Sequence, residues 1–222
     1  MSPARRTESL SREVVVTAAI ELLDEHGERG FTFKLLTERL RTGAGAIYWH
    51  VANKEELVRL CADRILGDAL AAAGPEQDLR SLALAVYDAL DRHSWAARHV
   101  IVLPSLPSAL HLLDRIGTLL TGTPLPAERR FLVATAIFNY VVSVTAQDVV
   151  RVATVDTSAG RDALLAEYAK SWESLDAQTF PFLTGAAADL REHDDRDQFV
   201  AGLDLLLDGL RHQSGGGQPV QG

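Results

Sequence analysis

Hydrophobic residues recur at helical spacing from the start of the chain. Between Ser11 and His26 they follow the i, i+4, i+7, i+8 pattern of one helix face, as Val15, Ala19, Leu22 and Leu23. Ser11 is a residue type that caps helix N-termini, and Gly27 is a type that ends helices. The pattern therefore predicts a first helix over Ser11–His26.

Shorter helices follow the first one. Thr32 suits the N-cap of a helix that runs to Leu40, with Leu36 and Leu40 facing inward. After the turn Arg41-Thr42-Gly43, a third short helix is predicted over Ala44–Val51. Asn53-Lys54-Glu55-Glu56 has the form of a capping box, with Asn53 as N-cap and Glu56 at the third helical position. It opens a fourth helix that continues towards Ala73.

The rest of the chain continues the helical pattern. Helices are predicted over Glu76–His93, Ser94–Leu103, Ser105–Leu120, Ala127–Val152, Arg161–Leu175, Leu183–His193 and Asp195–Arg211. Three helices within fifty residues, the last two short and joined by a tight turn, predict a helix-turn-helix DNA-binding head in residues 1–66 of an all-α protein. A larger helical domain follows in residues 67–213, and residues 214–222 form a disordered tail of low apolar content.

Charge is distributed unevenly along the chain. The formal net charge is −8, but residues 1–64 contain ten Lys and Arg against ten Asp and Glu, so the remainder carries the whole excess. A neutral head on an acidic body suits a protein that presents one end to a polyanion. The lone Cys61 excludes an intrachain disulfide, and no stretch has the pattern of a signal peptide or a membrane span. We expect a cytoplasmic protein without a membrane partner.

The short third helix has an unusual outward face. At 100° per residue, Ile47 and Val51 share the inward side, whereas Gly45 and Trp49 point away from it. Two short helices joined by a tight turn are the pattern of a helix-turn-helix unit, whose second helix enters the DNA major groove. The alternative is that Tyr48 and Trp49 pack into the protein core, where most aromatic side chains lie.

The stretch from Leu10 to Leu66 resembles the TetR family of bacterial repressors. The resemblance is carried by Gly27, Leu36, Leu40, the run Gly30-Phe31-Thr32, and above all the run Ile47-Tyr48-Trp49-His50-Val51-x-Asn53-Lys54, which is closest to the tetracycline-responsive branch. It implies a repressor that binds a palindromic operator as a homodimer and is released by a small organic ligand. It favours DNA contact over burial for the two aromatic residues.

Carried over by position, the resemblance implies a DNA-contacting set. It comprises Thr32, Lys34, Ala44, Gly45, Ala46, Tyr48, Trp49, His50 and Lys54. In this set Thr32 and Lys34, at the start of the second helix, are expected to contact phosphate and a base edge, and Lys54 is expected to contact phosphate. Where the tetracycline-responsive branch has polar base-reading side chains, this chain has only Ala44, Gly45 and Ala46. The operator sequence therefore does not carry over.

The body, residues 67–213, is the expected ligand-binding and dimerisation domain. Polar or aromatic residues within apolar helices are expected to line a pocket for a mostly apolar molecule: Trp95, His99, Val102, His111, Phe138, Asn139, Gln147 and Trp172. Individually each is more often a satisfied core or surface residue. The amphipathic stripe of the last helix is expected to form the dimer interface through Phe199, Leu203, Leu206, Leu207 and Leu210. The alternative is that this stripe serves only the core of one chain.

No metal or cofactor is expected. His99 matches a metal-binding histidine of the tetracycline-responsive branch, but Val102 and Gln147 replace its threonine and its carboxylate. A hard cation prefers charged oxygen ligands, so the magnesium complex of tetracycline is not the expected inducer. No catalytic or metal-ligand spacing stands out, which argues against a helical enzyme. A DNA-binding dimer that takes no ligand remains a further alternative.

Overall fold

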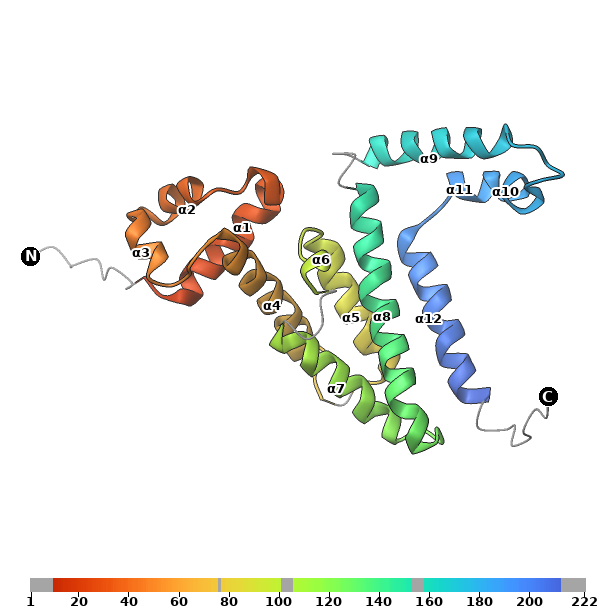
Figure 1. The fold of residues 1–222 in the computed structure, drawn as a ribbon, viewed down its shortest axis with the longest axis horizontal. Helices are drawn as coiled ribbons and strands as arrows, with labels where there is room; N and C mark the ends of the chain where they lie inside the picture. Colours follow the sequence, from red (N-terminus) through yellow and green to blue (C-terminus); the bar gives the residue numbers. More distant parts are fainter. Residues whose placement is uncertain (1–9, 76, 101–105, 153–157, 213–222) are drawn as a thin grey trace, which may run out of the picture.

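The protein is built of helices, as predicted. The computed structural model describes residues 10–75, 77–100, 106–152 and 158–212, and these residues contain no strand (Figure 1). Val102 and the predicted tail lie outside the described residues. The helices are α1 (Arg12–Gly30), α2 (Phe33–Leu40), α3 (Ala44–Tyr48), α4 (Lys54–Ala72), α5 (Leu79–Arg92), α6 (Ala97–Val100), α7 (Pro107–Thr121), α8 (Ala127–Val152), α9 (Ser158–Glu173), α10 (Pro181–Gly185), α11 (Ala187–Arg191) and α12 (Asp195–His212).

The predicted caps of the first two helices are present. The Ser11 side chain accepts a hydrogen bond from the Val14 amide, and Thr32 Oγ1 accepts one from the Leu35 amide. Gly27 has a φ of +64°, the left-handed conformation that glycine adopts most easily, and it interrupts the regular helix at the predicted position. The chain turns once more before α2, so α1 extends to Gly30.

The third helix is shorter than predicted, and the fourth begins as predicted. α3 ends at Tyr48, after which Trp49 and His50 continue as a turn. Asn53 Oδ1 accepts a hydrogen bond from the Glu56 amide at 2.8 Å, and Glu56 Oε2 accepts one from the Ala52 amide at 2.7 Å. The reciprocal bonds of a capping box therefore fix the start of α4, with the return bond one residue earlier than the N-cap.

Several predicted boundaries in the body differ from the structure, since α6 begins at Ala97, α7 at Pro107 and α9 at Ser158. α5 begins at Leu79 because Asp78 is its N-cap and accepts the Ser81 amide hydrogen bond at 2.7 Å. The helix predicted over Leu183–His193 is divided into α10 and α11, since the backbone leaves helical geometry at Ala186. No helix in the described parts of the chain has both the length and the low charge needed to cross a membrane.

One apolar core joins the head (α1–α3 and the start of α4) to the rest of the molecule, the body. α4 packs on α1 at one end and on α5, α6 and α7 further along, so it crosses the predicted boundary at residue 66 without a break. Cys61 of α4 is buried beside α1, where its thiol donates a hydrogen bond to the Val16 carbonyl, and this burial raises the pKa of the thiol to about 12. The thiol is therefore protonated and unreactive at neutral pH.

The predicted dimer stripe of α12 lies mostly inside the chain's own core. Phe199 and Leu203 are fully buried and Leu207 is nearly so, while Leu206 and Leu210 are half-buried. Phe199 stacks on Tyr87 of α5 and on Tyr140 of α8, with ring centroids 4.3 Å and 5.6 Å apart. Phe199, Leu203 and Leu207 therefore serve the core of one chain, as the alternative held, whereas a part in the dimer interface stays a prediction for the half-buried Leu206 and Leu210.

Gly202 allows the close contact between α8 and α12. A Cβ atom at this position would lie 2.1 Å from Tyr140 Oη, which donates a hydrogen bond to the Phe199 carbonyl at 2.9 Å. Replacing Gly202 by alanine is expected to lower the stability of the chain by about 1–2 kcal/mol, because overpacking outweighs the better helix propensity of alanine. Gly117→Ala is the control, since its Cβ meets no atom within 4 Å. Thermal unfolding of both variants measures the difference, and equal melting temperatures would contradict this account of the contact.

The helices α9, α10 and α11 form an arm that extends beyond one end of α8 and α12 (Figure 1). α9 packs on α11 and α10, burying Leu165, Ala169 and Ala187. An ion pair of 2.8 Å between Arg161 of α9 and Asp195 of α12 links the arm to α12. The outer side of the arm exposes Tyr168, Phe180 and Phe182.

Candidate DNA-binding site

The outward face of α3 is open to solvent. Ile47 is fully buried and Val51 is 2% exposed, whereas Trp49 is 86% and Tyr48 54% exposed. Ala44, Gly45 and Ala46 are exposed on the same helix, and His50 is half-buried. The alternative that Trp49 packs into the core is therefore wrong. An indole exposed to this extent is a costly surface feature unless a partner covers it.

α2 supports α3 and presents its own N-terminus. Phe33 of α2 packs against Tyr48 with ring centroids 5.1 Å apart, which holds the phenol in place beside Trp49. The first turn of α2 contains no acidic residue, and Lys34 in that turn is exposed, with no ion pair to any residue in the described ranges. A helix N-terminus with an adjacent free ammonium group favours phosphate. Thr32 and Lys34 thus lie at an exposed helix N-terminus, and their contacts with phosphate stay a prediction.

Lys54 has a different environment from the one predicted. Its ammonium donates hydrogen bonds to the carbonyls of Glu28 and Phe31, at 2.7 Å and 2.6 Å, and lies 5.6 Å from the centre of the Phe31 ring. These bonds fasten the segment between α1 and α2 to the start of α4. The structure therefore gives Lys54 a structural role, and its contact with phosphate stays a prediction.

Two carboxylates of α1 connect the head to the body. Asp24 accepts hydrogen bonds from Trp95 Nε1 at 2.8 Å and from His93 Nδ1 at 2.9 Å. Glu28, one turn further along, pairs with Arg98 and with His99 Nε2, the latter at 2.9 Å. We call this set the head–body contact. It assigns Trp95 and His99 to the joint between the two parts, where the sequence had placed them in a ligand pocket.

The Glu28 carboxylate is ionised in this contact. Burial by itself raises the pKa of Glu28, but the hydrogen bond from His99 and the positive charges of Arg98 and His99 lower it further than burial raises it. The net pKa of Glu28 is below its ordinary value of 4.5. Its contribution to stability is therefore present above pH 4.5 and is lost as the pH falls through the lowered value.

The remaining predicted ligand residues do not come together. Phe138 is 1% exposed in the core, whereas His111, Asn139 and Gln147 are exposed on α7 and α8, and Trp172 is half-buried on the arm. Apolar periodicity locates a helix face without showing which element covers it, so the residues predicted to share one pocket are divided between the core, the exposed sides of α7 and α8, and the arm. The prediction of one pocket lined by these residues is therefore not supported by their positions.

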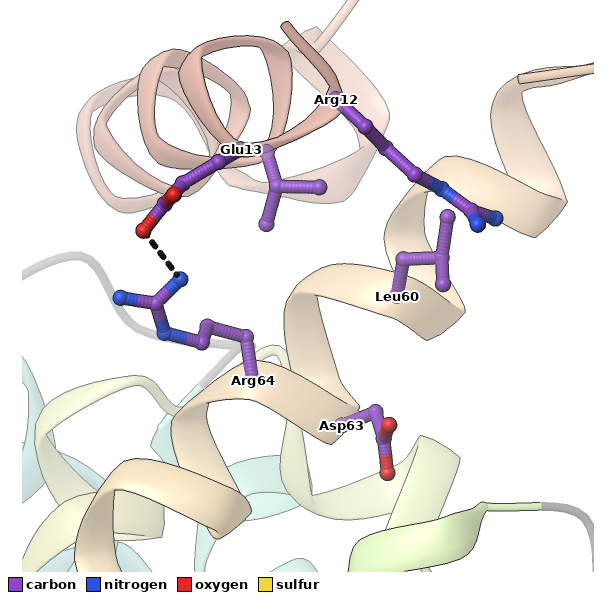
Figure 2. Close-up of a pocket in the computed structure, with 6 residues that line it drawn as sticks. Arg12, Glu13, Leu60, Asp63 and Arg64 are labelled. Atoms are coloured by element: carbon purple, nitrogen blue, oxygen red, sulfur yellow. Dashed lines mark hydrogen bonds and ion pairs between the residues drawn. The ribbon is translucent and has the colours of Figure 1, made fainter. Parts of the chain in front are cut away.

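Two surface hollows lie elsewhere. One, of about 270 Å³, lies between α1 and α4, where Glu13 and Arg64 form an ion pair at 3.3 Å across it (Figure 2). The other, of about 400 Å³, lies between α7 and α8 and is lined by apolar side chains such as Leu110, Leu113 and Phe131. Neither is lined by any predicted ligand residue. Within the described ranges no three His, Cys, Asp or Glu side chains are grouped as a metal site requires.

Comparisons with known proteins cover both parts of the chain. Residues 15–61 match the family described as bacterial regulatory proteins, tetR family, and residues 71–214 match the tetracyclin repressor-like C-terminal domain. A transcriptional regulator of the helix-turn-helix type from Saccharopolyspora erythraea is 29% identical over 206 residues, which is 87% of this chain and 84% of that protein. The matches therefore include head and body together.

Solved structures have the same arrangement. The TetR regulator SCO7222 from Streptomyces coelicolor is 37% identical, with a TM-score of 0.75 over 91% of this chain and 98% of its own. The TetR family protein ActR from the same species, solved with actinorhodin, is 23% identical, with a TM-score of 0.73 over 93% of this chain and 99% of its own. This chain belongs to the TetR family of bacterial transcriptional regulators.

Proposed function

We propose that this regulator binds a palindromic operator as a homodimer through the face made by the N-terminus of α2 and the outward side of α3. The observation that carries the proposal is Trp49, which is 86% exposed on a helix whose opposite side is completely buried. The α2 N-terminus with Lys34 supplies phosphate contacts beside it. These contacts are independent of sequence and hold α3 in register on the duplex.

Selection from a pool of random duplexes tests this function. The full chain is expected to enrich a two-fold symmetric sequence whose half-sites are about one helical turn, or a multiple of it, apart. Binding to this selected operator is expected to weaken steeply as salt is raised, because bound phosphates release counterions. A pool that shows no enrichment over its starting composition would contradict the function.

The outward faces of α8 and α12 are the proposed dimer interface. On α8, the exposed residues Leu132, Ala136 and Asn139 follow one helical stripe, and on α12 Ala201 and Leu205 do the same. Leu132 and Leu205 are 65% and 75% exposed in the single chain. Small residues on both stripes let helices approach closely. A two-fold pairing of these faces would cover the leucines.

Leu205→Arg is expected to convert the dimer into a monomer that keeps its helical content. The substitution brings the arginines of the two copies together in an apolar interface, which costs several kcal/mol of dimerisation free energy. It removes no contact within the chain's own core. Sedimentation velocity and circular dichroism measure the two properties. Thr17→Arg, on the exposed side of α1, is the matched control and should remain dimeric. A dimeric Leu205→Arg variant would place the interface elsewhere.

The arm supports pairing with a second copy. Phe182 is 78% exposed and Tyr168 51%, and both lie on elements that project beyond the chain's own body. Exposed aromatic residues of this size, grouped on one projecting element, indicate a surface that is covered in the assembled protein. The second copy is the partner that the two-fold pairing of α8 and α12 would bring nearest.

The proposed ligand is a mostly apolar organic molecule that binds without a divalent metal. ActR, a structural relative of this chain, was solved with actinorhodin, an organic ligand. His99, the one histidine that a metal could use by family position, is engaged with Glu28. The ligand would act by favouring a state in which the heads no longer fit the operator.

Release of the selected operator by actinorhodin, with and without EDTA, tests the ligand class. Release that is unaffected by EDTA is the expected result. Release that requires Mg²⁺ would contradict the metal-free proposal, and no release by actinorhodin or by a panel of apolar organic compounds would favour the alternative of a DNA-binding dimer without a ligand.

A further inference from the structure

The recognition surface of α3 has little capacity for hydrogen bonding. Its exposed side chains are the methyl groups of Ala44 and Ala46, the bare backbone of Gly45, and the rings of Tyr48 and Trp49. Between residues 44 and 50 the sequence contains no Arg, Lys, Asn or Gln. Those four are the side chains that make paired hydrogen bonds to guanine or adenine in the major groove.

The same surface can approach DNA closely. A Cβ atom built on Gly45 meets no other atom within 4 Å, so the space beside the helix is empty on its outward side. Ala44 and Ala46 project only one carbon beyond the backbone on either side of it. Trp49 extends furthest, and no ring or charged group within the described ranges stacks on it. The surface therefore combines a shallow apolar floor with one large apolar projection.

The thymine methyl group is the base feature that such a surface can distinguish. It is the only apolar group that the four bases present in the major groove, and small apolar or aromatic side chains recognise it by contact. The resemblance gives Thr32 and Lys34 of α2 one base edge at most, and their other expected contacts are with phosphate, which carries no sequence information. Discrimination among bases by this pair of helices must then come mainly from the apolar surface of α3.

We infer that α3 selects operator half-sites through the 5-methyl groups of thymine, which pack against Ala44, Ala46 and Trp49. The inference rests on the proposed DNA-binding function and specifies the chemistry of its target. The operator half-site is accordingly expected to contain thymines at the base pairs under α3, on either strand. Guanine contacts by paired hydrogen bonds are not expected from this helix.

Replacement of thymine by deoxyuridine in the selected operator tests the inference, because it removes the methyl group and leaves every hydrogen-bonding group of the base unchanged. The affinity of the full-length protein is expected to fall about tenfold or more when all half-site thymines are replaced, which corresponds to the loss of at least one base contact. Deoxyuridine outside the half-sites is the control and should have no effect. Equal affinity for both operators would overturn the inference.

A double-substitution cycle identifies the side chain involved. Each thymine of a half-site is replaced by deoxyuridine in turn, and the loss of affinity is measured for the wild type and for Trp49→Ala. At positions that the indole contacts, the loss should be smaller in the variant than in the wild type. At positions that Ala44 or Ala46 contacts, the loss should be the same in both proteins. A deoxyuridine effect of the same size in wild type and variant at every position would exclude Trp49 from methyl recognition. If no operator is enriched at all, the proposed function fails, which is a different outcome from an operator that ignores its methyl groups.

Discussion

Trp49→Ala is expected to abolish specific operator binding while leaving the melting temperature of the protein almost unchanged. The indole is 86% exposed, so its removal deletes few contacts within the chain and should change stability by no more than about 0.5 kcal/mol. At an interface, loss of a central aromatic contact costs about 2 kcal/mol or more. Two half-sites in a symmetric dimer then lose roughly a thousandfold in affinity.

Binding titrations on the selected operator and thermal unfolding measure the two effects separately. Ile47→Ala is the contrasting variant, because Ile47 is fully buried on the same helix and its truncation should cost about 2–5 kcal/mol of stability. If Trp49→Ala instead destabilised the chain as much as Ile47→Ala, the indole would be part of the fold and its assignment to DNA would be mistaken.

Asp24→Ala is expected to lower both stability and operator affinity, although Asp24 belongs to neither α2 nor α3. The substitution leaves Trp95 Nε1 without its acceptor inside a largely buried site, where an unsatisfied donor costs about 1–3 kcal/mol. For a chain of this length, that corresponds to a fall in melting temperature of about 3–10 °C. Operator affinity should fall roughly tenfold, because a head without the Asp24 part of the head–body contact adopts the DNA-binding orientation for a smaller fraction of the time.

Asp24→Asn separates the hydrogen bond from the charge. The amide oxygen can still accept the indole hydrogen bond, but it cannot form an ion pair with protonated His93. Stability close to wild type is therefore expected for this variant. If Asp24→Ala binds the operator as tightly as wild type despite its lower melting temperature, the head–body contact stabilises the chain without setting the position of the head.

Local signals in the sequence predicted most of the head, apart from the end of α3 and the contacts of Lys54. The caps at Ser11, Thr32 and Asn53 and the interruption at Gly27 each depend on residues within four positions, so their geometry could be predicted without the rest of the fold. The outward direction of Trp49 followed from helical periodicity with one buried neighbour, Ile47. The resemblance to the TetR family selected DNA as the partner of that surface.

The body could not be predicted to the same degree, because its faces are defined by contacts distant in sequence. The apolar stripe of α12 marks a buried face, but only the packing of Phe199 on Tyr87 and Tyr140 shows that the covering elements belong to the same chain. Likewise, nothing near Trp95 or His99 in the sequence indicates that their partners are Asp24 and Glu28, about seventy positions earlier. The same holds for Lys54, because its carbonyl acceptors, Glu28 and Phe31, lie more than twenty positions earlier, at the end of α1.

Photo-crosslinking of the protein to its operator tests the central claim most directly. 5-Iododeoxyuridine carries iodine in place of the thymine methyl group, so at half-site thymines it reports the side chains that lie against that position. The account predicts that peptides containing Trp49 or Tyr48 are the main crosslinked products, and that the yield falls sharply in Trp49→Ala. Crosslinks confined to the arm or to the outer faces of α8 and α12 would contradict the assignment of the α2–α3 face to DNA.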